Sequence, residues 1–315
     1  MSKYDYLKKT YMKALVISGG GSKGAFAGGV AEYLIKEKKK KYDIFLGTST
    51  GSLMVSHLAL GKIDTLRDMY TSVNQRTIFS NNPFVVKRVD GHKVVSINHL
   101  NVIWNFIMGR KTFGESKNLR KLIRKKFSEE EFNILKASDK EAIVTVSNIT
   151  QNQVEYKSVN DYSYLDFCDW IWASCNYVPF MSLLHKDGCH YADGGLGCLV
   201  PIREAINRGA KEVDVIILET EITQVNRIPA KNPFSVLMNS YAFMMDHVEK
   251  HNITIGKLSA KQNDVKLNLY YTPTILTTNS LVFDKKLMAQ WWKDGYSYAA
   301  TQHNDEMNTL KFDLE

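Results

Sequence analysis

Cysteine pairs, long apolar runs and a leader segment are all missing from this sequence of 315 residues. Its four cysteines form no C-x-x-C pair, so we expect neither a zinc ribbon nor a disulfide scaffold, and a reducing compartment is favoured. No apolar run approaches the roughly 20 residues of a membrane-spanning helix. Residues 1–11 are polar and lack the apolar core of a signal peptide. We therefore expect a cytoplasmic protein that would meet a membrane only at its surface.

Acidic residues are outnumbered by basic ones, which gives a net charge of +8 and a pI of about 9.1. The excess indicates an anionic partner but does not choose between a membrane surface and nucleic acid. Two basic clusters lie at Lys36–Lys41 and at Arg120–Lys126. Either they are solvated helix ends, or they hold the protein peripherally on an anionic membrane. Neither cluster carries the interleaved aromatics of a nucleic-acid face, so we expect no nucleic acid.

A serine between two glycines follows a short apolar run at residues 44–46. The stretch is Gly47-Thr48-Ser49-Thr50-Gly51, and the residues after it have helical spacing. A strand, a tight glycine corner and a helix would lift the hydroxyl of Ser49 clear of a sheet, beside a helix N-terminus that favours developing negative charge. This is the setting of a nucleophilic serine, although G-x-S-x-G alone also occurs as an ordinary turn.

A glycine loop, Gly19-Gly20-Gly21-Ser22-Lys23-Gly24, joins an earlier predicted strand to a helix. It matches G-x-G-x-x-G, but the acidic residue expected at the end of the next strand of a dinucleotide site is missing. No G-K-[ST] follows, which argues against a nucleotide P-loop. The remaining use of such a loop is to present backbone N–H groups to an anion. In a parallel sheet this loop and Ser49 share one edge, so we interpret it as an oxyanion site.

The rest of the chain continues the alternation of strands and helices that is typical of an α/β sheet. Residues 74–114 give mixed signals, and we expect a long connection with short helices, a candidate lid whose apolar residues 103–108 pack as core. Asp193, followed by Gly194 and Gly195, reads most simply as a turn. With no repeat or linker, we predict one domain over 1–315, with a motif-bearing core at about 13–218 and a mainly helical extension at about 219–315. Further strands are expected at 14–18, 141–147, 154–159, 213–218 and 265–271, and helices at 64–73, 115–126, 128–136, 166–175, 201–208, 233–250 and 284–300.

The glycine loop, the serine corner and the aspartate turn, in this order, resemble the patatin-like phospholipase family, in particular its bacterial members. The family pattern is G-G-G-x-[RK]-G, G-x-S-x-G and D-G-[GA], and residues 173–180 are similar to its A-S-x-x-x-P-x-F segment. Each motif is weak alone, but four in order are specific. The resemblance covers about residues 13–218 and implies a three-layer α/β sandwich, with a central, mostly parallel sheet flanked by helices.

The resemblance also implies a lipid acyl hydrolase with a Ser-Asp dyad. Asp193 would accept the proton of Ser49, which attacks a fatty-acyl ester of a phospholipid or lysophospholipid to form an acyl-enzyme. Backbone N–H groups of Gly20 and Gly21 would hold the oxyanion. Lys23 would support the loop or add positive potential, and no metal or cofactor is required.

Two alternatives stay open at this point. One is an α/β-hydrolase esterase with a Ser-Asp-His triad, which wants several strands before the serine corner, whereas this sequence shows a single one before that corner's own strand. His57 lies eight residues after Ser49, about 12 Å along a helix axis and too far to act as its base. The other is a non-catalytic lipid-binding protein on the same fold, against which the intact serine, aspartate and glycine loop argue.

Overall fold

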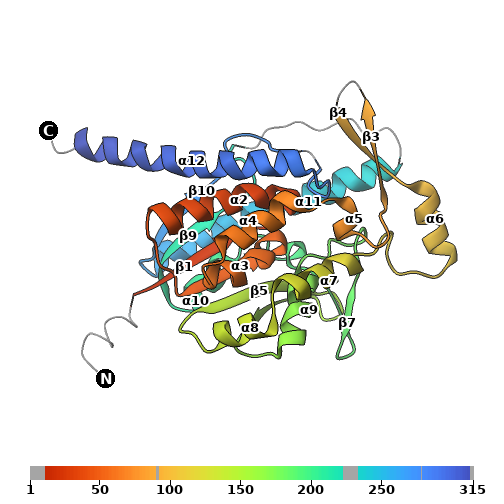
Figure 1. Ribbon diagram of the computed structural model, residues 1–315, viewed down its shortest axis with the longest axis horizontal. Helices are drawn as coiled ribbons and strands as arrows, with labels where there is room; N and C mark the ends of the chain where they lie inside the picture. Colours follow the sequence, from red (N-terminus) through yellow and green to blue (C-terminus); the bar gives the residue numbers. More distant parts are fainter. Residues whose placement is uncertain (1–10, 90–91, 223–232, 278, 313–315) are drawn as a thin grey trace.

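The protein is built around a mostly parallel β-sheet, seen in a computed structural model that describes residues 11–89, 92–222, 233–277 and 279–312 (Figure 1). Within these residues the sheet has eight strands, in the order β10-β9-β1-β2-β5-β8-β7, with β6 also paired to β5. The strands of this sheet are β1 (Met12–Ile17), β2 (Ile44–Thr48), β5 (Glu141–Asn148), β6 (Gln153–Ser158), β7 (Leu184–Lys186), β8 (Cys189–Asp193), β9 (Ala210–Ile216) and β10 (Lys266–Tyr270).

Parallel pairing places the carboxyl ends of the central strands at one edge. β10, β9, β1, β2 and β5 pair in parallel, whereas β6, β8 and β7 form the antiparallel side of the sheet. The central strands are almost entirely buried apolar runs, as expected when helices cover both faces. This confirms the predicted α/β fold with a central, mostly parallel sheet flanked by helices.

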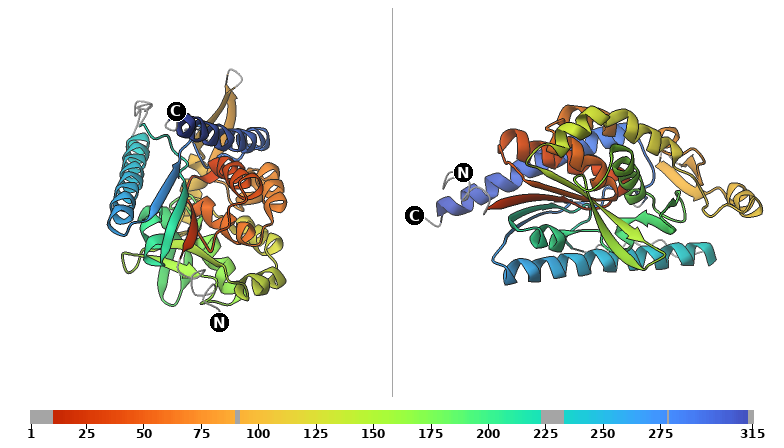
Figure 2. Two further views of the ribbon diagram at one scale, coloured as in Figure 1. Left: turned by 90° about the vertical axis from the view of Figure 1, so that its left-hand side faces the viewer. Right: turned by 90° about the horizontal axis from the view of Figure 1, so that it is seen from below.

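Helices form a layer on each face of the sheet (Figure 2). Each face of the sheet carries a hydrophobic core. The core on one face contains Phe26, Leu58 and Trp170, and the core on the other face, with Ile202 and Ala260, lies beneath α10 and α11. The helices are α2 (Gly24–Glu32), α3 (Ser52–Ala59), α4 (Ile63–Ser72), α5 (Gln75–Ile78), α6 (His99–Ile107), α7 (Lys117–Lys126), α8 (Glu129–Lys136), α9 (Tyr164–Ser174), α10 (Ile202–Asn207), α11 (Pro233–Gln262) and α12 (Lys285–Phe312). No helix among the described residues is both long and apolar enough to cross a bilayer.

Helices α2 and α12 touch backbone to backbone, although some 260 residues separate them in the chain. A β-carbon placed on Gly29 would lie 1.9 Å from the carbonyl oxygen of Trp292, and one on Gly295 would lie 2.1 Å from that of Phe26. Only glycine permits such an approach. The last helix therefore fixes the helix that follows the glycine loop.

Residues 74–114 differ from the sequence-based expectation. They contain an antiparallel hairpin, β3 (Phe84–Val89) and β4 (His92–Ile97), as well as the short helices α5 and α6. The expectation that residues 103–108 pack as core is wrong, because most of their apolar side chains are more than half exposed. From the whole segment, within the described residues, only Ile78 reaches the wall of the main cavity. Among its described residues, the segment therefore contributes a single side chain to that wall.

Candidate active site

Ser49 lies on a sharp corner between β2 and α3. Its φ angle is +53°, in the left-handed region that residues other than glycine rarely adopt. The corner is possible because Gly47 and Gly51 have no side chains. A β-carbon on Gly47 would lie 2.4 Å from the backbone of Gly51, and one on Gly51 would lie 2.3 Å from the carbonyl oxygen of Ile17. The predicted corner is thus present, with its serine at the carboxyl edge of the sheet.

The hydroxyl of Ser174 holds this corner from the opposite side. It accepts a hydrogen bond from the Ser49 amide (3.0 Å) and donates one to the carbonyl oxygen of Thr145 in β5 (2.6 Å). It also lies 2.7 Å from the hydroxyl of Ser52 at the start of α3. One fully buried side chain at the end of α9 therefore joins the serine corner to two neighbouring elements.

The glycine loop between β1 and α2 lies against the serine. A β-carbon on Gly19 would lie 3.2 Å from that of Ser49. The amide of Gly19 is bound to the Leu199 carbonyl and the amide of Ser22 to the Ser280 carbonyl. By contrast, the amides of Gly20 and Gly21 donate to no group in the described part of the chain. Gly21, at φ +55°, begins the short helix that leads into α2. Two free backbone donors therefore line the cavity beside Ser49.

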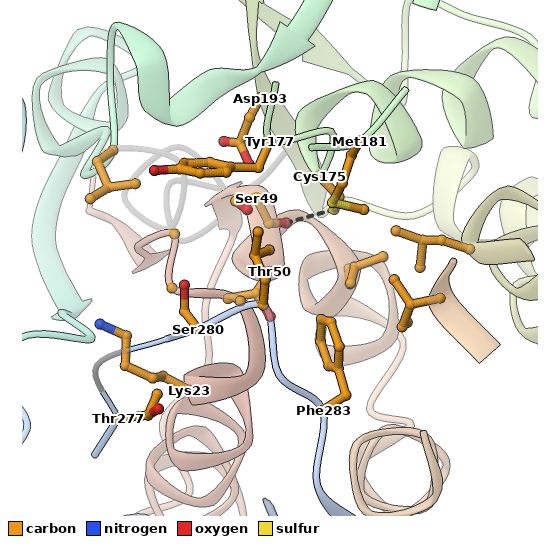
Figure 3. Close-up of a pocket in the computed structure, with 18 of the residues that line it drawn as sticks. Lys23, Ser49, Thr50, Cys175, Tyr177, Met181, Asp193, Thr277, Ser280 and Phe283 are labelled. Carbon is orange, nitrogen blue, oxygen red and sulfur yellow. Dashed lines mark hydrogen bonds between the residues drawn. The ribbon is translucent and has the colours of Figure 1, made fainter. Parts of the chain in front are cut away.

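Asp193 lies at the end of β8 and is 2% exposed. The register of the sheet brings it there, because β8 pairs with β5 and β5 with β2, the strand that carries the serine. Its carboxylate accepts a hydrogen bond from the Gly195 amide (2.8 Å) and lies beside the side chain of Ser49, which lowers its pKa (Figure 3). Burial raises the pKa of Asp193 to about 7, and these two groups oppose the rise. A carboxylate poised near neutrality is suited to accept a proton from the serine.

The predicted site residues do not all approach the serine equally. The chain brings Ser49, Asp193 and the loop glycines together, and a β-carbon on Gly194 would meet the Thr145 backbone at 2.3 Å. Lys23 lies at the far side of the cavity and forms an ion pair with Glu219. The side chain of Ser22 is buried. Gly24 is followed by Ala25, whose side chain packs in the core. Lys23 and Ser22 thus support the loop and do not face the serine.

Histidines are not part of this arrangement. His57 is buried, with Nε2 3.0 Å from the carbonyl oxygen of Lys126, and burial lowers its pKa. The rings of His185 and His190 lie 4.9 Å apart in the β7–β8 hairpin and are tilted by 55° to each other. Within the described residues, no histidine lines the cavity that contains Ser49 and Asp193.

The cavity has a volume of about 290 Å³, and Ser49 divides it into two unlike ends (Figure 3). One end is apolar, with Met181 and Phe283 in view; the other end carries Lys23 and Thr277. The apolar residues that line the cavity also include Leu53, Met69, Val73, Ile78, Leu119, Leu122, Ile123 and Met288. The polar end is completed by Glu219, Asp246, Glu249 and Ser280.

Sequence reasoning missed several residues of this site. Cys175 donates a hydrogen bond to the Ser49 carbonyl (3.0 Å), and Tyr177 lines the cavity beside Asp193. Both residues belong to the segment 173–180, which matches a family pattern. A sequence pattern does not show which atoms its residues contact. Glu249 of α11 is 7% exposed, and burial, with nearby Glu219, raises its pKa to about 8 despite Lys23. In the sequence, Glu249 is one of several charged residues on its helix, and nothing local marks it as buried.

Comparisons with known proteins agree with this geometry. Among solved structures, the crystal structure of VipD from Legionella pneumophila is similar at a TM-score of 0.51 and 14% identity, which supports the fold alone. The match covers 93% of this chain and 66% of that one, so this chain spans just under two thirds of VipD's length in that structure. No curated protein matches. The family model described as Patatin-like phospholipase matches residues 15–206, more than half of the sequence. The chain therefore belongs to the patatin-like phospholipase family.

Proposed function

We propose that the protein is a serine lipid acyl hydrolase that cleaves fatty-acyl esters of a phospholipid or lysophospholipid through a Ser49–Asp193 dyad. The observation that carries the proposal is the meeting of three parts in one cavity. These are a strained serine, a buried carboxylate beside its side chain, and two loop amides that donate to no group among the described residues. Membership of the family supports lipid hydrolysis in general, and the dyad and the substrate are our inference.

The reaction follows from these positions. Asp193 takes the proton of Ser49 as the serine oxygen attacks the ester carbonyl. The amides of Gly20 and Gly21 stabilise the oxyanion, a contribution of roughly 3–4 kcal/mol for each such donor. Asp193 then returns the proton to the departing alcohol, and the acyl group remains on Ser49. A water molecule, deprotonated by Asp193, attacks the acyl-enzyme, and the fatty acid leaves as the serine regains its proton.

The two ends of the cavity support the choice of substrate class. An acyl chain in the apolar end would lie among aliphatic side chains, at about 0.8 kcal/mol for each methylene removed from water. The head group would then lie toward Lys23, Glu219 and Glu249. With this arrangement we infer that the ester would lie between the two ends, next to Ser49, whose position relative to Met181 and Lys23 can be followed in Figure 3.

The competing functions receive less support. A Ser-His-Asp triad needs an imidazole within hydrogen-bond reach of the serine, and among the described residues that line the cavity there is none. A non-catalytic lipid-binding protein would not need a left-handed serine, whose backbone strain costs of order 1–3 kcal/mol.

The test combines a covalent probe with a lipid panel. A fluorophosphonate should label the wild-type protein and not Ser49→Ala. Asp193→Asn should stay folded and lose at least about 100-fold in kcat on a soluble ester, because the serine then lacks its base. Fatty-acid release from phospholipid, lysophospholipid and neutral lipid identifies the substrate. Equal labelling of the wild type and Ser49→Ala would remove the serine from the mechanism, and a fully active Asp193→Asn would place the base elsewhere.

A further inference from the structure

In helix α6 the asparagines face the protein and the apolar residues face outward, which is the reverse of an ordinary surface helix. Asn105 is 1% exposed and donates to the Phe113 carbonyl (2.7 Å), and Asn101 donates to the side chain of Asn81 (2.6 Å). Its apolar residues face outward, with Leu100 82% exposed and Ile107 71% exposed. The other outward apolar residues are Ile103, Trp104, Phe106 and Met108, each more than half exposed.

This orientation is fixed by hydrogen bonds. Oδ1 of Asn105 also accepts from Arg110 (3.2 Å) and from Asn81 (3.3 Å), so its buried amide is held on both sides. Rotating the helix to bury its apolar face would break these bonds and leave polar groups unpaired. Isolated exposed apolar residues are ordinary on a protein surface, but a contiguous group on one helix is typical of an interaction site.

The charged residues next to the end of α6 are basic. Residues 91–114 contain no aspartate or glutamate, although Asp90 and Glu115 border this stretch, and Arg110 and Lys111 lie within four residues of the end of the helix. Both are exposed, and Nζ of Lys111 lies 2.9 Å from Nε2 of His190, another basic group. An apolar helix face that is followed by the exposed cations Arg110 and Lys111 is complementary to the surface of an anionic bilayer, where acyl chains lie beneath negative head groups.

The position of α6 links this face to the catalytic cavity. It projects at the end of the molecule toward which the central strands run, together with the β3–β4 hairpin (Figure 1). A row of aromatic rings leads inward from it, with centroid separations of 6.1 Å from Phe106 to Phe113, 5.9 Å to Phe180 and 6.1 Å to Tyr177. Tyr177 is a wall of the cavity. A surface that takes up α6 would therefore lie near the catalytic end.

We propose that α6 is an interfacial anchor, whose apolar face enters an anionic lipid bilayer and whose flanking Arg110 and Lys111 lie among the head groups. The choice of a bilayer over a protein partner rests on the proposed lipid hydrolysis, since that substrate resides in such a surface. The reversed packing of the helix is independent of that function. The two ideas can therefore fail separately.

Trp104 provides a direct test. It is 57% exposed, whereas the other four tryptophans, all among the described residues, are at most 8% exposed. The Ser49→Ala protein, which leaves the lipid intact, is mixed with vesicles of phosphatidylcholine containing phosphatidylglycerol. Insertion should shift the tryptophan emission to shorter wavelength and make the protein co-sediment, and Trp104→Phe should abolish the shift but keep the sedimentation. Vesicles of phosphatidylcholine alone should bind at least tenfold more weakly.

A matched pair of variants locates the binding surface. Ile103 on α6 and Ile134 on α8 are both 56% exposed, so replacing either by aspartate should leave the protein folded. Ile103→Asp should weaken vesicle binding and vesicle hydrolysis at least tenfold and leave hydrolysis of a soluble short-chain ester unchanged. Ile134→Asp should change none of the three.

Three results would overturn the anchor. The first is vesicle binding without a shift in Trp104 emission, and the second is equal binding by Ile103→Asp and Ile134→Asp. The third is a failure to bind vesicles together with self-association in light scattering that Ile103→Asp abolishes, which would assign the face to a second copy of the chain. If the folded wild-type protein does not hydrolyse a soluble ester, that result would instead contradict the proposed function, whatever the vesicle experiments show.

Discussion

Asp193 combines two properties that work against each other. In the proposed mechanism it must be ionised to take the proton of Ser49, yet its site is dry and favours the neutral acid. Cavity access by a substrate excludes further water, which strengthens this tension. The residue therefore links catalysis and stability through one protonation equilibrium.

This linkage predicts opposite pH dependences for activity and stability. Hydrolysis of a soluble ester should rise with pH through about 7, because the pKa of Asp193 is about 7. The folded-state pKa lies above the usual value of 3.8, so the stability from the neutral acid is complete below that value and is lost as pH rises through about 7. At pH 8 the free energy of unfolding of Asp193→Asn should thus exceed that of the wild type by up to on the order of 4 kcal/mol, and the difference should shrink toward pH 4. Thermal unfolding at several pH values measures it, and a constant difference would contradict the raised pKa.

At the scale of elements, the joint between α9, β5 and the serine corner depends on Ser174. This hydroxyl is a positioning group, since it touches the backbone of Ser49 and neither the proposed nucleophilic oxygen nor the substrate. We expect these hydrogen bonds of Ser174 to set the orientation of Ser49, whose backbone is left-handed.

Removing this hydroxyl should reduce both stability and rate. Ser174→Ala leaves the Ser49 amide and the Thr145 carbonyl without their partner, at a cost of about 1–3 kcal/mol. A corner that moves by a fraction of an ångström should lower kcat about 10- to 100-fold on a soluble ester with little change in KM. Ser56→Ala is the matched control, because the Ser56 hydroxyl is also buried but has no hydrogen-bond partner among the described residues. Equal effects of the two substitutions would assign Ser174 no special role.

The elements that sequence predicted well are those with a strong local signal. The apolar runs around Ile44 and Ile143 became central strands, and the glycine corner formed where its motif predicted, because chain geometry there leaves few alternatives. Sequence analysis did not predict the β3–β4 hairpin, although the dipeptide Asp90-Gly91 is a typical hairpin signal in a sequence, because the basic and apolar residues around it alternate only in part. The outward face of α6 could not be predicted, because apolar periodicity does not tell which side of a helix meets the protein.

At the scale of the whole molecule, the basic clusters are less available than the net charge suggests. Lys40 is paired with Asp214 and Lys36 with Asp64. Both precede β2, at the edge of the sheet opposite the serine. In the second cluster, Arg120 and Arg124 hold Asp169. Contact with a membrane through the first cluster would turn the cavity away from the lipid, which argues for the proposed contact through α6 over contact through this cluster.

The backbone contact between α2 and α12 has a consequence for the order in which the protein is made. The oxyanion loop leaves the ribosome early, but Ser280 holds its Ser22 amide and Trp292 packs against Gly28, and both are translated more than 250 residues later. A nascent chain therefore carries Ser49 and the glycine loop without the contacts that Ser280 and Trp292 make with the loop and α2, and we expect it to be inactive until these residues are in place. Ribosome-bound chains stalled before Ser280 is made should not react with a fluorophosphonate, whereas chains released after α12 should; labelling of the stalled chains would show that the loop forms alone.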